Sequence, residues 1–493
     1  MSLDTLLLAG AGVLLAALGS ARLSSWLGLP SLLLFMFLGV GVGLFVEFDN
    51  AALAHDLGFA ALVLILAEGG FTTRWREIRG VLTLSGLLAT LGVGVSISAM
   101  TLFAHYALGL DLATSLLLGA ITAPTDSAAV FSVLRRVPIP GRLRAILEAE
   151  SGLNDAPVVL LTTAATAWAL GETTEGPVVI LAMVGVELAG GLALGLAIGW
   201  LGALMLKRTA LPASGLYPLG MMGWALLAYG TGAFLHVSGF AAVYVCAMVL
   251  GNSDLPHRNA TRSFAEGIGW VAQIGLFVML GLLADPERFS VEVVLTGALA
   301  GLFLTVIARP LSVAACATWF RVPWREQAFL SWAGLRGAVP IIMATVPLAS
   351  PLPQAPALFD LVFVFVVVYT TVQAPTLGWV AHRLGVATGD EAVDIEVEVA
   401  PLDKIQADFM QIKVPEGSQL HGVMIFELRL PPSTVVSLII RDGNPFAPGA
   451  KDVIRTGDEL LVVVPSRLRY RVENRLKQVG RGGRLSRWHE DRE

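Results

Sequence analysis

The five residues Ala123-Pro-Thr-Asp-Ser127 put a proline and a carboxylate inside a long hydrophobic run. A second run contains Gly334-Leu-Arg-Gly-Ala-Val-Pro340, which combines helix-breaking residues with an arginine. At membrane depth, non-helical backbone is tolerated only where its freed polar groups are buried in protein or line a cavity. Both stretches therefore predict broken helices that surround an internal polar space.

The composition places these breaks in a membrane protein. Of the 493 residues, 55% are hydrophobic and 14% are charged, and the mean hydropathy is +0.73, which is outside the range of soluble domains. Residues 1–384 are about 10% charged and residues 385–493 about 29%, so we expect a membrane domain followed by a soluble one. The net charge of −5 argues against a nucleic-acid partner, which requires a concentrated basic face.

Thirteen hydrophobic runs come close to the roughly 20 residues that cross a bilayer as a helix. Fifteen Lys and Arg residues fall in the loops on one side of these runs, and only Arg288 falls on the other. Basic loops mark the cytoplasmic side. We therefore expect a multi-pass protein of the plasma (bacterial inner) membrane with its N-terminus outside and its C-terminal domain in the cytoplasm. The runs are 5–20, 30–46, 56–72, 81–104, 115–134, 145–170, 177–204, 215–236, 239–251, 263–283, 292–314, 326–349 and 357–381.

The two broken spans are the fifth and the twelfth, so they cross the membrane in opposite directions. Opposed broken helices in matching halves are typical of inverted-repeat transporters, whose binding site lies where the breaks meet. We expect one repeat near spans 1–6 and the other near spans 8–13, in an all-α polytopic fold. The alternative is a pair of unrelated proline kinks in an ordinary helical bundle.

Few charged residues lie within the runs, and the sixth run carries several in Glu148-Ala-Glu-Ser-Gly-Leu-Asn-Asp-Ala-Pro157. A charge at bilayer depth costs at least about 2.5 kcal/mol, so it normally faces a cavity or an opposite charge. At 100° per residue, Ser151 and Asp155 share one face of this helix, and Glu150 and Asn154 share the next. We expect Asp155 to point into a cavity and Glu150 to point toward an arginine.

The oxygen atoms on these spans suit a monovalent cation. Na⁺ and K⁺ bind hard ligands such as carboxylates, hydroxyls and carbonyls, and the third, fifth and sixth spans supply all three kinds. The pKa of a carboxyl group rises when the group is buried. A proton and a cation then compete for one buried aspartate near neutral pH.

These motifs, together with Ala308-Arg-Pro310, strongly resemble the monovalent cation:proton antiporters of the NhaP/NHE type. The resemblance covers residues 1–384. It implies a thirteen-span fold that forms homodimers, and an elevator-like motion of a core bundle that includes spans 5, 6 and 12. It also implies that the protein exchanges K⁺ or Na⁺ for H⁺ and needs no cofactor.

The resemblance assigns the ion site by position in the motifs. Asp155 is the acid that alternately holds a proton or a cation, and Asn154 is its orienting neighbour. Ser151, Glu68 and the backbone carbonyl of Thr125 are the further cation ligands that the resemblance implies.

Four charged residues receive supporting roles from the same resemblance. Glu150 pairs with Arg309 as a structural bridge. Asp126 and Arg336 offset the half-helix ends where the two broken chains cross. The family usually continues Thr-Asp with proline, whereas Ser127 stands here, so the backbone geometry around the break is open.

The soluble part has three alternating stretches, 409–414, 435–440 and 459–464, and then a basic helix over 466–479. The pattern Leu438-Ile-Ile-Arg-Asp-Gly443, followed by Gly-Asp-Glu-Leu-Leu-Val-Val, is similar to TrkA-C (RCK-C) domains. This similarity implies a regulatory α+β domain that responds to a small molecule or nucleotide. A module used only for dimerisation is the alternative. The predicted divisions are a membrane domain over 1–384, a linker over 385–395, the TrkA-C-like domain over 396–479 and a polar tail over 480–493.

We therefore predict a secondary-active antiporter and not an enzyme. Potassium is preferred over sodium because TrkA-C domains accompany potassium handling, and a single titrating carboxylate favours electroneutral exchange. A gated monovalent cation channel with an RCK-type domain is the main alternative, and a non-transporting membrane sensor is another. The sequence contains no P-loop, which argues against an ATP-driven pump. Cys246 and Cys316 lie in apolar runs, which argues against a disulfide framework or a zinc site.

Overall fold

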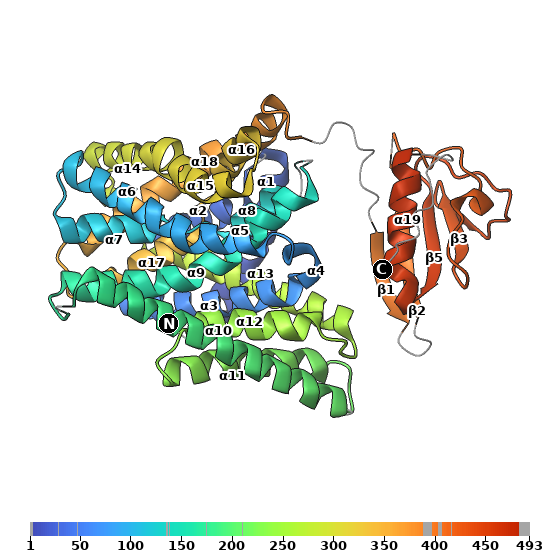
Figure 1. Cartoon of the computed structure of the whole chain (residues 1–493), viewed down its shortest axis with the longest axis horizontal. Helices are drawn as coiled ribbons and strands as arrows, with labels where there is room; N and C mark the ends of the chain where they lie inside the picture. The colour runs from blue at the N-terminus through green and yellow to red at the C-terminus, as the bar shows by residue number, and fades with distance from the viewer. Residues whose placement is uncertain are drawn as a thin grey trace. The chain divides into compact units, whose positions relative to one another are not determined.

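The computed structural model describes residues 3–27, 29–46, 48–134, 137, 139–173, 175–209, 211–387, 397–402, 407–415 and 417–482. They belong to two compact units, Met1–Ala387 and Thr388–Glu493. Helices build the first unit, and the second contains a β-sheet (Figure 1).

Each predicted hydrophobic run overlaps one helix or a set of consecutive helical segments of the first unit. The uninterrupted helices are α1 (Leu3–Leu27), α2 (Ser31–Gly43), α3 (Ala51–Thr72), α9 (Gly141–Ala169), α10 (Pro177–Arg208), α11 (Leu216–Phe234), α12 (Gly239–Asn252), α13 (Arg258–Leu283) and α18 (Ala355–Arg383). The interrupted spans are α5 (Leu82–Leu87) with η1 (Leu88–Gly92) and α6 (Val93–Tyr106); α7 (Leu112–Thr122) with α8 (Ser127–Leu134); α14 (Val291–Phe303) with η3 (Leu304–Ala308) and α15 (Arg309–Ala317); and α16 (Trp324–Trp332) with α17 (Ala338–Leu348).

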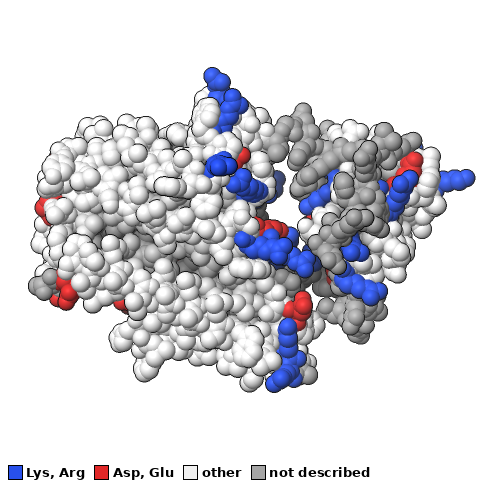
Figure 2. Space-filling model, in the orientation of Figure 1, with Lys and Arg blue, Asp and Glu red and all other residues white. Residues whose placement is uncertain are grey.

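Among the described residues, seven helices are long and apolar enough to cross a membrane, judged by length and composition. Four shorter apolar helices, α2, α7, α12 and α17, accompany them. Two of these, α7 and α17, are short because each is one half of a broken span. In Figure 2 the Lys and Arg side chains of the helical unit gather at one end, and most of its visible surface is uncharged. This distribution is typical of a multi-pass membrane protein.

The two broken spans meet at their breaks, as the sequence predicts. The backbone N–H of Asp126 donates a hydrogen bond to the carbonyl of Leu335 over 3.0 Å. The non-helical segments between α7 and α8 and between α16 and α17 are therefore in direct contact. Four half-helix ends are thereby brought to one place inside the unit.

Two π-helical turns, η1 and η3, interrupt the fourth and eleventh spans. These spans are also seven apart, so the turns occupy matching places in the two predicted repeats. The Ser312 hydroxyl, on α15, donates a hydrogen bond to the carbonyl of Gly92 at the end of η1 over 2.8 Å. The sequence analysis did not predict the π-turns, which lie within continuous apolar stretches.

The helices pack as two groups. One group contains α2, α3, α10, α11, α12 and α13, and the other contains α5 to α9 and α14 to α18. Contacts between the groups include those of α3, α12 and α13 with α9 and α17. The boundary between the groups therefore runs past the broken spans.

The second unit is a five-stranded antiparallel sheet in the order β1-β2-β5-β3-β4, with one helix, α19 (Arg469–Gly482). The three predicted strands correspond to β2 (Ala407–Lys413), β3 (Val435–Arg441) and β5 (Glu459–Pro465). The sequence analysis missed β1 (Val397–Leu402) and β4 (Asn444–Phe446). β3 and β4 form a hairpin whose two turn residues, Asp442 and Gly443, have positive φ angles of 51° and 79°, as a type I′ turn requires.

The last helix of the second unit differs from its predicted bounds. The helix predicted over 466–479 begins at Arg469 and continues to Gly482, so the first three residues of the predicted polar tail are helical. The remaining tail residues, 483–493, lie outside the described residues. Most of the predicted linker, 388–395, lies outside them as well.

Candidate functional site

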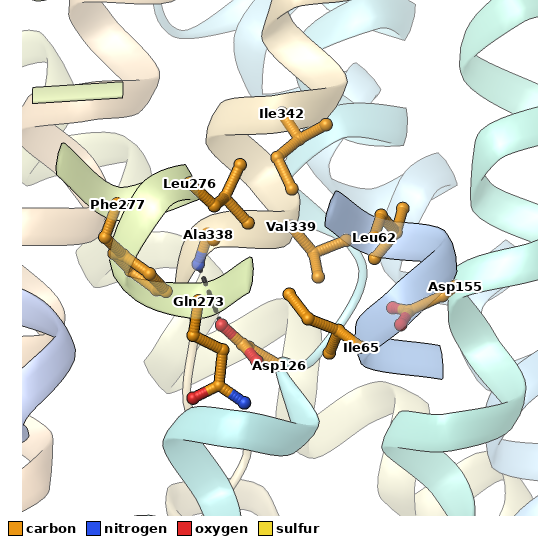
Figure 3. Close-up of a pocket in the computed structure, with 10 residues that line it drawn as sticks. All are labelled: Leu62, Ile65, Asp126, Asp155, Gln273, Leu276, Phe277, Ala338, Val339 and Ile342. Carbon is orange, nitrogen blue, oxygen red and sulfur yellow. Dashed lines mark hydrogen bonds between the residues drawn. The ribbon is translucent and has the colours of Figure 1, made fainter. Parts of the chain in front are cut away.

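Asp155 lies in the middle of α9 and is 1% exposed. With Asp126 it lines a cavity of about 10 Å³ whose other walls come from α3, α13 and α17 (Figure 3). This is close to the smallest space that holds one water molecule. Asp155 Oδ1 is buried and has no hydrogen-bond partner among the described residues. One buried carboxylate oxygen is thus available to an ion.

Asn154 connects α9 to the first broken span. Its side-chain Nδ2 donates a hydrogen bond to Thr125 Oγ1 over 2.8 Å, and both residues are buried. The other atom of the amide, Asn154 Oδ1, is buried without a hydrogen-bond partner in the described part of the chain. Asn154 therefore holds the broken segment close to Asp155. Its amide oxygen is a second buried oxygen atom, without charge, next to Asp155 in the chain.

Asp126 sits at the start of two half-helices. Its Oδ2 accepts a hydrogen bond from the N–H of Ala338, the first residue of α17, over 2.8 Å. Its Oδ1 accepts one from the N–H of Ala129, in the first turn of α8, over 3.4 Å. Carboxylates stabilise helix N-termini, where N–H groups are unpaired and the helix dipole is positive. A Cβ atom at Gly337 would overlap the Asp126 carboxylate, so this arrangement requires glycine there.

Arg336 has the complementary role at the end of α7. Its Nε donates to the carbonyl of Thr122, the last residue of α7, over 3.2 Å, and its Nη1 donates to the carbonyl of Gly334. A cation stabilises a helix C-terminus, where carbonyl groups are unpaired. Each of these two charged residues therefore binds a half-helix end of the opposite broken span. Asp126 binds the start of α17, and Arg336 binds the end of α7.

Glu150 and Arg309 form a bidentate ion pair between α9 and α15. The distances from Nη1 to Oε1 and from Nη2 to Oε2 are 2.5 and 2.8 Å. The two side chains are 1% and 4% exposed. Paired forks of this kind are among the stronger hydrogen-bonded contacts in proteins, so both oxygens of Glu150 are occupied.

Of the five predicted ligands, Asp155 is among the residues that line the cavity, whereas Asn154, Thr125, Ser151 and Glu68 are not. The Ser151 hydroxyl donates to the Leu147 carbonyl over 2.6 Å, one turn of α9 away from Asp155. Glu68 is half-buried on α3, and its Cγ packs against Gly269 of α13. Their role as cation ligands stays a prediction.

The sequence analysis missed Gln273, which lines the cavity from α13 (Figure 3). Gln273 is the one polar side chain in the apolar stretch from Ile268 to Leu283, apart from the indole of Trp270. An amide in such a stretch is itself a signal of a cavity. The stretch contains no charged residue and none of the motifs that indicated the predicted site, so Gln273 was not predicted.

Residues 13–383 match the family described as sodium/hydrogen exchanger, transmembrane, and residues 409–477 match the TrkA-C domain. The chain is 32% identical to the K(+)/H(+) antiporter NhaP2 of Shewanella oneidensis over 99% of this chain and 86% of that protein. It is 33% identical to the K(+)/H(+) antiporter NhaP of Alkalimonas amylolytica over 92% of this chain and 80% of that protein.

A solved structure has the same fold as the helical unit. It is the sodium proton antiporter MjNhaP1 of Methanocaldococcus jannaschii, with a TM-score of 0.68 and 22% identity. The match covers 78% of this chain and 99% of that one. The family match extends over more than half of the chain and includes both broken spans. The chain therefore belongs to the sodium/hydrogen exchanger family and is a multi-pass membrane protein with a C-terminal TrkA-C domain.

Proposed function

We propose that this cation:proton antiporter exchanges one H⁺ for one K⁺, and that Asp155 holds the two ions in turn. The observation that carries the proposal is the different bonding of three buried carboxylates. Glu150 is occupied by Arg309, and Asp126 accepts hydrogen bonds from two half-helix ends. Asp155 keeps a buried oxygen with no partner among the described residues. Of the three, Asp155 is the carboxylate that remains able to exchange one ion for another.

The cost of burying a charge explains why binding of the two ions is coupled. An ionised carboxylate in a site of low polarity is unfavourable unless a proton or a cation neutralises it. Either ion makes the site neutral, so we expect the protein to move Asp155 across the membrane only with one of them bound. The cavity of about 10 Å³ has no room for a hydrated cation. Oxygens of Asp155, Asn154 and Thr125 would then replace its water.

Two lines of support favour potassium over sodium. The relatives from Shewanella oneidensis and Alkalimonas amylolytica are both named K(+)/H(+) antiporters. The chain also carries a TrkA-C domain, a type of domain that accompanies potassium handling. Both lines concern the whole chain and not the geometry of the cavity.

The setting of the protein is part of the same proposal. The basic loops support a plasma-membrane protein with its N-terminus outside and its TrkA-C domain in the cytoplasm. We further infer a homodimer, no cofactor, and regulation by a small molecule or nucleotide that binds the TrkA-C domain. The domain limits are those of the sequence analysis, 1–384 for transport and 396–479 for regulation.

A chain that ends near residue 390 should still exchange ions but respond differently to cytoplasmic pH, cation or nucleotide. Loss of all transport in a correctly inserted truncated chain would contradict a purely regulatory role.

The test of the proposed exchange is proton flux in proteoliposomes with K⁺, Na⁺ and Li⁺ supplied one at a time. Wild-type protein should give cation-driven proton flux, highest with K⁺, and Asp155→Asn should abolish it. Asp360→Asn is a matched control because Asp360 is a buried aspartate that pairs with Arg288 and does not line the cavity. Cation-driven flux in a folded Asp155→Asn variant would refute the assignment of Asp155. Ion currents that exceed the turnover rate of a transporter would favour a channel instead.

A further inference from the structure

Tyr244 of α12 covers α9 beside the ion site. Its side chain is buried, and its hydroxyl lies directly over the backbone of Gly152. A Cβ atom at Gly152 would lie 2.8 Å from Tyr244 Oη and 3.0 Å from the ring carbon that bears it. The phenol can therefore approach α9 this closely only because residue 152 is glycine.

The position of Gly152 places the hydroxyl between two carboxylates. Glu148, Gly152 and Asp155 are spaced four and three residues apart, which puts them on one face of α9. The rise from Glu148 to Asp155 is about 10 Å at 1.5 Å per residue. Tyr244 interacts electrostatically with both carboxylates. The hydroxyl is thus a polar group that lies between them on this face.

Glu148 is the more accessible of the two carboxylates. It is half-buried, whereas Asp155 is buried. It also lies nearer the start of α9 at Gly141, in the direction of the loops that we assign to the cytoplasm. An ion that moves along this face from the cytoplasm to Asp155 passes Glu148 first and the Tyr244 hydroxyl second.

Among the residues that the structure describes, the Tyr244 hydroxyl has only a weak hydrogen-bond partner. The contact that the structure gives it is with Thr73 Oγ1, at the end of α3, over 3.5 Å. That distance is at the limit for a hydrogen bond. A phenol oxygen carries acceptor capacity beyond one such contact, and oxygen is the ligand that Na⁺ and K⁺ prefer. Tyr244 and Thr73 belong to one helix group and α9 to the other, so the packing of Tyr244 against Gly152 crosses the boundary between the groups.

We propose that the Tyr244 hydroxyl is a contact for the cation on its way from Glu148 to Asp155 and that it sets the affinity for cations arriving from the cytoplasmic side. The inference rests on the proposed exchange of a cation for a proton at Asp155. Tyr244 acts on access to Asp155 and not on the occupancy of Asp155 itself. Its removal should therefore change the KM for the cation more than the maximal rate.

The experiment compares Tyr244→Phe with Tyr217→Phe in proteoliposomes of the full-length protein. Tyr217 is also buried, and its hydroxyl is hydrogen-bonded to backbone groups of Thr209 and Leu211. Both variants lose one buried phenol oxygen, but only Tyr244 faces α9 beside the ion site. Initial rates of proton flux are measured against K⁺ concentration, with K⁺ on either side of the membrane in separate runs.

In Tyr244→Phe, we expect the KM for K⁺ on the Glu148 side to rise about threefold to tenfold, the range for loss of one neutral oxygen contact. The maximal rate should stay near that of the wild type, and Tyr217→Phe should keep the wild-type KM. Glu148→Gln should raise the same KM. The double variant should raise it by less than the product of the two single effects, because both residues act on one step.

Three results would overturn the inference. These are an unchanged KM in Tyr244→Phe, an equal change in Tyr217→Phe, and an unchanged KM in Glu148→Gln. The last result decides the matter even if Tyr244→Phe fails to fold, because Glu148 is only half-buried and its substitution leaves the packing at Gly152 intact. If wild-type protein shows no cation-driven proton flux, the proposed function fails together with the inference. If wild-type flux is present and the variants keep its KM, only the inference fails.

Discussion

Removing one partner of the ion pair between Glu150 and Arg309 should destabilise the helical unit strongly. The pair is bidentate, at 2.5 and 2.8 Å, and its side chains are 1% and 4% exposed. In Glu150→Gln the guanidinium would keep a long 3.4 Å hydrogen bond to the Leu330 carbonyl and would remain in the field of Arg336. An uncompensated buried charge of this kind costs about 3–5 kcal/mol in the free energy of unfolding. Arg309→Met should cost a similar amount, because it leaves the Glu150 carboxylate buried without a cation.

Removing both charges together should cost much less than the sum of the single losses. Replacing a buried ion pair by neutral side chains of similar volume is often close to neutral for stability. We therefore expect a coupling energy of about 3 kcal/mol for Glu150→Gln with Arg309→Met. The control is the exposed pair between Arg74 and Glu77, at 3.1 Å with side chains 47% and 55% exposed. Its coupling energy should be below about 1 kcal/mol.

The measurement is chemical unfolding of the purified full-length protein in detergent, with all six variants and the wild type in one micelle composition. Free energies that follow from linear extrapolation give the two coupling energies directly. Single losses that add in the double variant to within about 0.5 kcal/mol would show that the two residues do not stabilise each other. If the coupling energy of Glu150 with Arg309 is no larger than that of Arg74 with Glu77, burial does not strengthen the ion pair and the prediction is refuted.

Three further outcomes are expected. Gly337→Ala should abolish cation-driven proton flux and lower thermal stability, because the added methyl group overlaps the Asp126 carboxylate; wild-type flux from this variant would contradict the capping arrangement. Burial acts to raise the pKa of the Asp458 carboxyl, but the hydrogen bonds from Arg441 and from the Arg455 amide outweigh burial and lower that pKa below its usual value. The stabilisation is then complete above the unfolded-state pKa of about 3.9 and is lost as the pH falls through the lower folded-state value. The hydrogen-exchange protection factors of amides in β3 and β5, which correct for the intrinsic exchange rate at each pH, should therefore fall in acid in wild-type protein and depend less on pH in Asp458→Asn. Cation:proton exchange should not respond to a membrane potential that is imposed with a valinomycin-type ionophore, when the exchanged cation is one that the ionophore does not carry. A steep response would contradict electroneutral exchange and would make Glu68 the first residue to neutralise.

The broken helices could be predicted because their causes are local. Pro124 and the glycines Gly334 and Gly337 disfavour a continued helix through their own backbone properties. The roles of the charged residues beside the breaks came from the resemblance to the NhaP/NHE antiporters. Arg336 lies on the carbonyl end of α7, and Asp126 lies on the N–H end of α17. Both positions agree with the offset of half-helix ends that the resemblance implies.

The remaining features depend on contacts between distant segments. Gln273 and Tyr244 lie on α13 and α12, which carry no motif, and their importance follows from the helices that pack against them. β4 has three residues and pairs only with β3, so it is too short for an alternating pattern to show. β1 contains Pro401 and lies at the edge of the sheet, the position where proline is tolerated in a strand.

The charges around the breaks are consistent with the proposed exchange of one monovalent ion in each half of the cycle. Three buried carboxylates, those of Glu150, Asp126 and Asp155, lie near two buried guanidinium groups, those of Arg309 and Arg336. With every group in its ordinary ionised form, this cluster carries a net charge of −1. One proton or one K⁺ at Asp155 brings it to zero, and a second monovalent ion would make it positive at a cost that grows in a medium of low polarity. Under the proposed exchange at Asp155, the two arginines would therefore also limit the number of ions that the cavity carries.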